Sequence, residues 1–133
     1  MKQLTLLRAD QETNYRYSGF AEFKDITAML EGYEFDEDVL AKAEIHKQNF
    51  IEYGESTESL TVPSVSATLR VSPTAEIEEE GEKLHFRFDD LDIVDGRSKL
   101  AAVTMMDQEW LENNYVKVSL FVLDKESMDK LYS

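Results

Sequence analysis

The sequence LDIVDGRSKLAAV, residues 91–103, decides the fold of this chain more than any other stretch. Its apolar beginning, residues 91–94, predicts a short buried strand, and the Asp-Gly pair that follows predicts a turn. Apolar residues then recur at helical spacing, which predicts a helix over residues 97–111. A strand that runs directly into a helix indicates a domain that mixes both kinds of element.

The rest of the chain alternates between strand and helix patterns in the same way. Alternating apolar side chains or short β-branched runs predict further strands at residues 4–7, 14–20, 60–71, 83–88 and 115–123. Helical spacing predicts a helix over residues 22–30 that ends at Gly32, a longer one from residue 35 to Gly54, and a last short one through Leu131 with Asp124 or Ser127 as its cap. We therefore expect one α+β domain over residues 1–133, with a mixed sheet of about four to six strands and flanking helices.

The turn at the start of the predicted 97–111 helix is the candidate binding site. Unpaired amides and the helix dipole make helix N-termini favourable places for anions. The candidate phosphate- or nucleotide-binding residues are Asp95, Gly96, Arg97, Ser98 and Lys99. Asp95 could accept hydrogen bonds from the free amides, Gly96 permits the turn, and the two basic side chains attract phosphate. The alternative is an ordinary turn in which Arg97 and Lys99 pair with nearby acids such as Asp92.

Composition limits the partners of the chain. It has 28 acidic against 14 basic residues, a formal net charge of −14, and no cysteine. The charge disfavours direct nonspecific binding to DNA, and the lack of cysteine excludes disulfides and thiolate chemistry. Because the sequence contains neither a secretory signal pattern nor a run of apolar residues long enough to span a bilayer, we expect a cytoplasmic protein without a membrane partner.

A group of carboxylates lies beside the candidate turn, at Asp89, Asp90, Asp92 and Asp95. It does not fit an EF-hand: with Asp90 at position 1, Val94 takes position 5 and Asp95 takes the position that requires glycine. A hard-cation site built from these carboxylates stays an alternative.

Three other features have simple structural interpretations. We expect the glutamate run within residues 73–81 to form an exposed loop or hairpin tip, because charge runs are usually solvated. His46 and His85 are predicted to lie at the surface. Trp110 is predicted to pack in the core and not to form a face for a partner. The sequence has no Gly-rich phosphate loop of a known class, which favours a binding protein over an enzyme.

The string Asp95-Gly96-Arg97-Ser98-Lys99-Leu100-Ala101-Ala102, after Asp92-Ile93-Val94, resembles the signature of the DGQHR-domain family. In that family an apolar strand leads into Asp-Gly-Gln-His-Arg and a Leu-Ala-rich helix. The resemblance extends over residues 60–133. This chain has Arg97, Ser98 and Lys99 in place of Gln, His and Arg, so it lacks the imidazole and keeps a cation at Lys99.

The family includes DndB-type proteins of DNA phosphorothioation systems, and its core is similar to the ParB and sulfiredoxin superfamily. The resemblance implies a ParB-like fold and a binding or regulatory role in DNA modification or phage defence, through a protein partner, with a nucleotide as the possible ligand. The chain would be a minimal or truncated DGQHR-like domain. Two alternatives remain: an acidic phage-type protein that mimics DNA and inhibits a DNA-handling enzyme, and a nucleotide hydrolase of the superfamily.

Overall fold

The computed structural model describes residues 1–57 and 65–132, and in this part of the chain seven strands form one sheet beside five helices. The elements in chain order are β1 (Lys2–Gln11), β2 (Arg16–Glu22), α1 (Phe23–Met29), α2 (Glu37–Thr57), β3 (Val65–Val71), β4 (Glu76–Glu80), β5 (Lys83–Phe88), β6 (Leu91–Asp95), α3 (Arg97–Thr104), α4 (Gln108–Asn113), β7 (Tyr115–Val122) and α5 (Lys125–Tyr132). The α+β class is confirmed, while the predicted four to six strands were too few.

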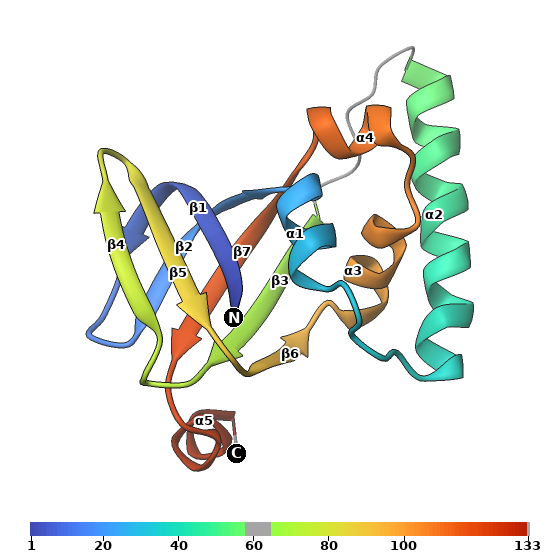
Figure 1. Cartoon of the computed structure of the whole chain (residues 1–133). Helices are drawn as coiled ribbons and strands as arrows, with labels where there is room; N and C mark the ends of the chain where they lie inside the picture. Colours follow the sequence, from blue (N-terminus) through green and yellow to red (C-terminus); the bar gives the residue numbers. More distant parts are fainter. Residues whose placement is uncertain (58–64, 133) are drawn as a thin grey trace.

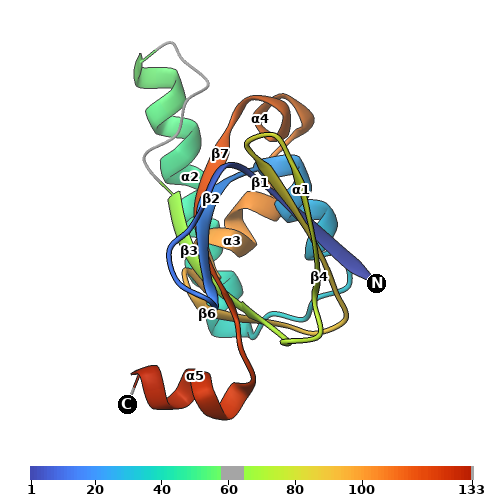
Figure 2. The ribbon, with the colours of Figure 1, turned by 90° about the vertical axis from the view of Figure 1, so that its left-hand side faces the viewer.

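The strands follow the order β4-β5-β1-β2-β7-β3-β6, and every neighbouring pair is antiparallel except β7 and β3. β1 turns the sheet, because its first half pairs with β5 and its second half with β2. The register shifts near Arg8, whose φ of 50° marks an irregularity in the strand. The resulting curved sheet holds α1 and α3 on its concave side, and α2 lies outside α3 (Figures 1 and 2).

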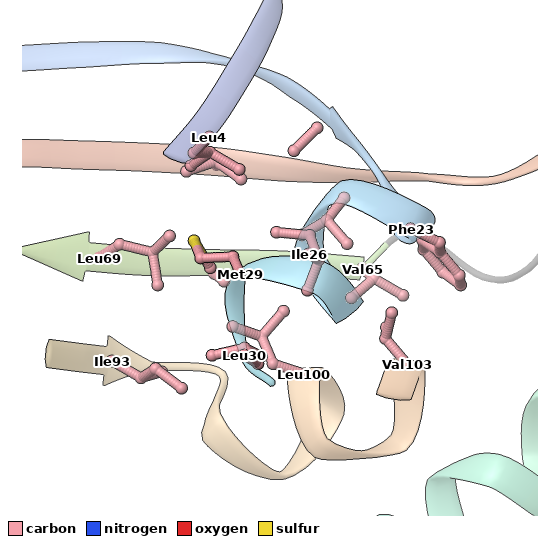
Figure 3. Close-up of a cluster of buried hydrophobic side chains, with 14 of the residues drawn as sticks. Leu4, Phe23, Ile26, Met29, Leu30, Val65, Leu69, Ile93, Leu100 and Val103 are labelled. Carbon is pink, nitrogen blue, oxygen red and sulfur yellow. The ribbon is translucent and has the colours of Figure 1, made fainter. Parts of the chain in front are cut away.

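The main core lies between the concave face of the sheet and helices α1 and α3 (Figure 3). The predicted 22–30 helix forms as α1, and its apolar residues Phe23, Ile26 and Met29 are buried. Leu100 and Val103 of α3 meet them from the other side and are fully buried. Burial of such a side chain contributes about 1.5–3 kcal/mol, so this packing holds α3 against α1 and the sheet.

The long helix differs from its prediction at both its end and its buried side. α2 continues through Gly54 to Thr57, so glycine is not its stop. The apolar spacing of the helix could place Leu40 and Ile45 on a buried side, but they have 38% and 63% of their surface exposed, because α2 packs mainly against α3. The polar segment after Gly54, which the expected end of the helix would leave as a loop, is therefore helical as far as residue 57. Residues 58–64, including the beginning of the predicted 60–71 strand, lie outside the described part.

The predicted 97–111 helix is two helices. α3 ends at Thr104, and α4 starts after Asp107, whose carboxylate accepts a hydrogen bond from the backbone N–H of Trp110 at 3.3 Å. This N-cap begins a new helix with a new direction. Trp110 is 8% exposed and belongs to the core, which confirms its structural interpretation.

The glutamate run forms strand β4 at one edge of the sheet and not a loop. It is exposed, as predicted, but it pairs with β5 as one arm of a hairpin. Alternate glutamates stand opposite basic residues of β5: Glu76 opposite Arg87, Glu78 opposite His85 and Glu80 opposite Lys83. Pairs of acidic and basic residues across strands stabilise a sheet. Pairing with β5 therefore accounts for the glutamates of β4.

His85 is half-buried and not turned freely toward solvent as predicted. Its Nδ1 lies 2.9 Å from the hydroxyl of Thr5 on β1, and its Nε2 lies 3.6 Å from a carboxylate oxygen of Glu80. The histidine therefore joins three neighbouring strands.

Candidate functional site

The turn between β6 and α3 lines a surface pocket of about 460 Å³. All five residues that the sequence singled out contribute to its wall: Asp95, Gly96, Arg97, Ser98 and Lys99. The wall is completed by Val39 and Lys42 of α2, by Ser66 of β3 and by Val94 of β6. The predicted residues thus come together, and α2 adds a cation that the sequence analysis did not name.

Gly96 sets the geometry of the turn. It is the N-cap residue of α3 and has a φ of 87°, in the left-handed region that favours glycine. A Cβ at this position would lie 2.7 Å from the backbone oxygen of Ser66 and 3.2 Å from the Cα of Ala67. The turn is therefore pressed against β3, and only a residue without a side chain fits there.

The first turn of α3 offers backbone donors. The first helical bond runs from the N–H of Leu100 to the oxygen of Gly96 at 2.9 Å. No side chain among the described residues caps the helix, so the prediction that Asp95 accepts from the amides is wrong. The N–H groups of Arg97, Ser98 and Lys99 precede the first helical bond and are available to an acceptor in the pocket.

The basic side chains of the pocket lack the acidic partners that the alternative interpretation gave them. Arg97 donates from Nη2 to the backbone oxygen of Ile93 at 3.0 Å. Asp92 is bonded to Arg70 instead. Within the described ranges, neither Lys42 nor Lys99 forms an ion pair. Three cations therefore line one pocket, and in the described part neither Arg97 nor Lys99 forms the ion pair with Asp92 that the alternative interpretation gave them.

His46 adds a titratable group to this region. It lies on α2 one helical turn after Lys42 and is half-buried, less exposed than the predicted surface position implies. Partial burial, and then the charge of Lys99, lower the pKa of His46 below its usual 6.5. The effect of Lys99 indicates that the two side chains, on α2 and α3, lie near enough to interact through space.

The residue that sequence analysis missed is Arg70. It is 2% exposed on β3 and donates to Asp92, to Asp90 at 2.7 Å from Nη2, and to the backbone oxygen of Leu123 at 2.7 Å from Nη1. Burial alone lowers its pKa, but the bonds to the two carboxylates raise it overall. An arginine within an apolar strand was the available signal, since such a charge needs partners.

The carboxylates beside the turn are explained by this arginine. Two of the four, Asp90 and Asp92, hold Arg70. Within residues 1–57 and 65–132, no group of three or more acidic or histidine side chains is arranged to hold a metal ion. The alternative of a hard-cation site therefore has no support in the described geometry.

Comparison with protein families, with curated proteins and with solved structures gives no significant match to this chain. In the part of the chain that the structure describes, no helix has the length and apolar character needed to cross a membrane. The pocket itself is therefore the feature of the chain that bears on its function.

Proposed function

We propose that this chain is a binding module that holds a phosphate-bearing ligand, such as a nucleotide, in the pocket at the start of α3. The observation that carries the proposal is the set of three cations, Lys42, Arg97 and Lys99, around one pocket without a carboxylate bound to any of them in the described ranges. An anion in the pocket would lie beside all three cations at once.

The backbone supports the same ligand. Phosphate oxygens accept hydrogen bonds from helix N-terminal amides, and the helix dipole favours negative charge at that end. The N–H groups of Arg97, Ser98 and Lys99 and the hydroxyl of Ser98 would act together with the cations. Charge-assisted bonds of this kind are about twice as strong as neutral ones.

The biological setting is proposed from the resemblance to the DGQHR-domain family. The module would act in DNA modification or phage defence by regulating a protein partner according to whether the ligand is bound. We propose binding without turnover, because Asp95 is the one carboxylate among the described residues of the pocket wall and the family's histidine is replaced by Ser98. Nucleotide hydrolysis by the purified protein that Asp95→Ala abolishes would contradict this part.

Thermal unfolding with and without nucleotide tests the proposal. A ligand that binds only the folded state raises the midpoint temperature of unfolding. At a ligand concentration one hundred times Kd, it adds about 2.7 kcal/mol to the free energy of unfolding. ATP should raise the midpoint of the wild type and not that of the Arg97→Ala/Lys99→Ala double variant. Lys117→Ala/Lys125→Ala is the matched control, since it removes two exposed cations outside the pocket. Equal shifts in all three proteins would contradict the proposal.

The second candidate function is inhibition of a DNA-handling enzyme by DNA mimicry, in which an acidic surface of this chain occupies the DNA groove of the enzyme. The observation in its favour is a group of five exposed carboxylates around the start of α2, none of which has an ion pair in the described ranges: Glu31, Glu34, Asp36, Glu37 and Asp38. Binding to a basic DNA-processing enzyme should then weaken steeply with salt and compete with duplex DNA. Binding that salt does not affect would count against it.

A further inference from the structure

We infer that a second pocket, at the opposite end of the strand order from β6, binds a primary ammonium group carried on an apolar carbon chain. The pocket lies between the ends of β1 and β2 and the hairpin of β4 and β5, which stands away from α3 (Figure 1). Its volume is about 290 Å³, close to the lower limit for small-molecule sites. No described residue lines both this pocket and the pocket at α3.

The charged side chains of this pocket are acidic. Glu79 and Glu82 line it, and no Lys, Arg or His among the described residues does. Neither glutamate forms an ion pair within residues 1–57 and 65–132. Glu79 stands opposite Leu84 of β5, whereas its neighbour Glu78 stands opposite a basic residue. The cross-strand charge pairing that accounts for the other glutamates of β4 therefore does not account for Glu79.

Tyr17 supplies a polar group that the fold leaves without a partner. The residue is only 8% exposed, and it lines the pocket. Its hydroxyl forms no hydrogen bond with a described residue, and it is not among the side-chain atoms that the fold closes off from solvent. Because the rest of the residue is buried, this hydroxyl lies at the pocket wall. A buried tyrosine hydroxyl usually has a hydrogen-bond partner, and a ligand in the pocket would supply it.

The strand register brings the phenol and the carboxylate of Glu79 to the same face of the sheet. The ring of Tyr17 packs edge-on against Phe86, with the ring centroids 5.3 Å apart. Phe86 stands opposite Ile77, and the next cross-strand pair on that face is Leu84 and Glu79. The basic residues of β5 alternate to the other face. Glu79 therefore lies with Tyr17 on the apolar face of the hairpin.

A primary ammonium matches these acceptors. It has three N–H donors and no acceptor, and the pocket offers the carboxylates of Glu79 and Glu82 and the hydroxyl of Tyr17. Ile77 and Leu84 can pack against the carbon chain, as apolar surface does along the stem of a lysine. A metal ion fits less well, because within the described ranges no three acidic or histidine side chains are grouped to hold one.

Chemical-shift titration of the full chain tests the inference at about pH 7, where an alkylamine is protonated, and at fixed ionic strength. The probes are n-pentylamine, the uncharged n-pentanol, and lysine with both its α-amino and carboxyl groups blocked. Pentylamine should shift the amide resonances of Tyr17, Glu79 and Gly81, and pentanol should bind at least about tenfold more weakly. Tighter binding of blocked lysine than of pentylamine would identify a lysine side chain as the source of the ammonium, and the reverse order would identify a free amine.

Two neighbouring glutamates give a matched pair of variants. Glu79→Gln and Glu78→Gln each remove one negative charge from β4, but only Glu79 lines the pocket. Glu79→Gln should weaken pentylamine about fivefold and Glu78→Gln less than about twofold. Tyr17→Phe should weaken it about threefold and leave the midpoint of thermal unfolding unchanged, because the hydroxyl has no partner in the described part of the fold.

Three results would overturn the inference. Equal losses in Glu79→Gln and Glu78→Gln would show that the amine responds only to the overall negative charge of the chain. Pentanol that binds as tightly as pentylamine would show that the pocket does not recognise the ammonium. Shifts confined to other parts of the protein, or none with any probe, would show that this pocket is not an amine site.

Discussion

Arg70 on β3 donates from Nε to Asp92 on β6 at 2.8 Å, within the strand that leads into the pocket. The same guanidinium also binds Asp90 and the backbone oxygen of Leu123, so it joins the edge strand β6 to the segment that leads into α5. Because Asp92 is held there, it is not the partner of Arg97. The ion pair thus anchors the strand that precedes the pocket.

Removing one carboxylate from Arg70 should destabilise the fold. Asp92→Asn leaves a buried guanidinium with weaker compensation, and we expect a loss of about 1–3 kcal/mol in the free energy of unfolding. Urea unfolding measures this loss. Asp89→Asn is the control, since Asp89 is exposed and close in sequence but has no ion pair within the described ranges. Equal stability of the two variants would show that the bond contributes nothing.

The same cluster predicts how stability changes in acid. Partial burial alone raises the pKa of Asp90, but hydrogen bonds from Arg70 and from the N–H of Ser72 lower it below the usual 3.8. The unfolded chain therefore takes up this proton first as the pH falls. The contribution of Asp90 is present above its ordinary pKa and is lost as the pH falls through the lower folded pKa. From about pH 5 to pH 2, the free energy of unfolding should fall more steeply for the wild type than for Asp90→Asn. Parallel curves for the two proteins would contradict this account.

The lowered pKa of His46 predicts a second loss of stability, at milder pH. Burial and Lys99 lower its folded pKa, so the unfolded state binds the proton first and stability declines as the pH falls below the usual 6.5. Denaturant unfolding between about pH 7.5 and pH 5 should therefore show a flatter dependence for His46→Gln. A ligand phosphate near Lys99 would offset that charge, so saturating tripolyphosphate should raise the His46 pKa in an NMR titration. A pKa that tripolyphosphate leaves unchanged would place the phosphate away from Lys99.

The turn at Gly96 predicts a contrast between two glycines. Gly96→Ala combines a left-handed backbone with a Cβ that would meet the Ser66 oxygen, and we expect a loss of about 2–4 kcal/mol. Gly32→Ala has a similar φ of 80° but no atom within 4 Å of the added carbon, so it should cost only about 1–2 kcal/mol. Thermal unfolding of both variants measures the difference. Equal losses would show that the approach of the turn to β3 is unimportant.

Sequence patterns predicted the elements whose apolar spacing is strong and local. α1, β5 and β7 lie within a residue or two of their expected positions, and Asp124 begins α5 by accepting a hydrogen bond from the N–H of Ser127. The break between α3 and α4 was missed because apolar residues continue across it and the Asp107 cap is a weak local signal. The strand character of β4 depends on cross-strand pairing with β5, which a run of glutamates does not reveal.

The sequence predicted only the part of the candidate site that is contiguous along the chain. The 95–99 turn is contiguous in sequence, so its residues had to lie together. Lys42 joins them through the packing of α2 on α3, and Asp92 is removed from them through the pairing of β3 with β6. Both are long-range relationships, and neither has a local pattern that a single sequence could supply.

Amide chemical-shift mapping tests the phosphate pocket most directly. Titration of the isotopically labelled protein with tripolyphosphate should move the backbone resonances of Gly96, Arg97, Ser98 and Lys99 most, with smaller changes around Lys42, and the Arg97→Ala/Lys99→Ala variant should show almost none of them. Shifts concentrated elsewhere on the protein, or a spectrum that tripolyphosphate leaves unchanged, would contradict the assignment of this pocket as an anion-binding site.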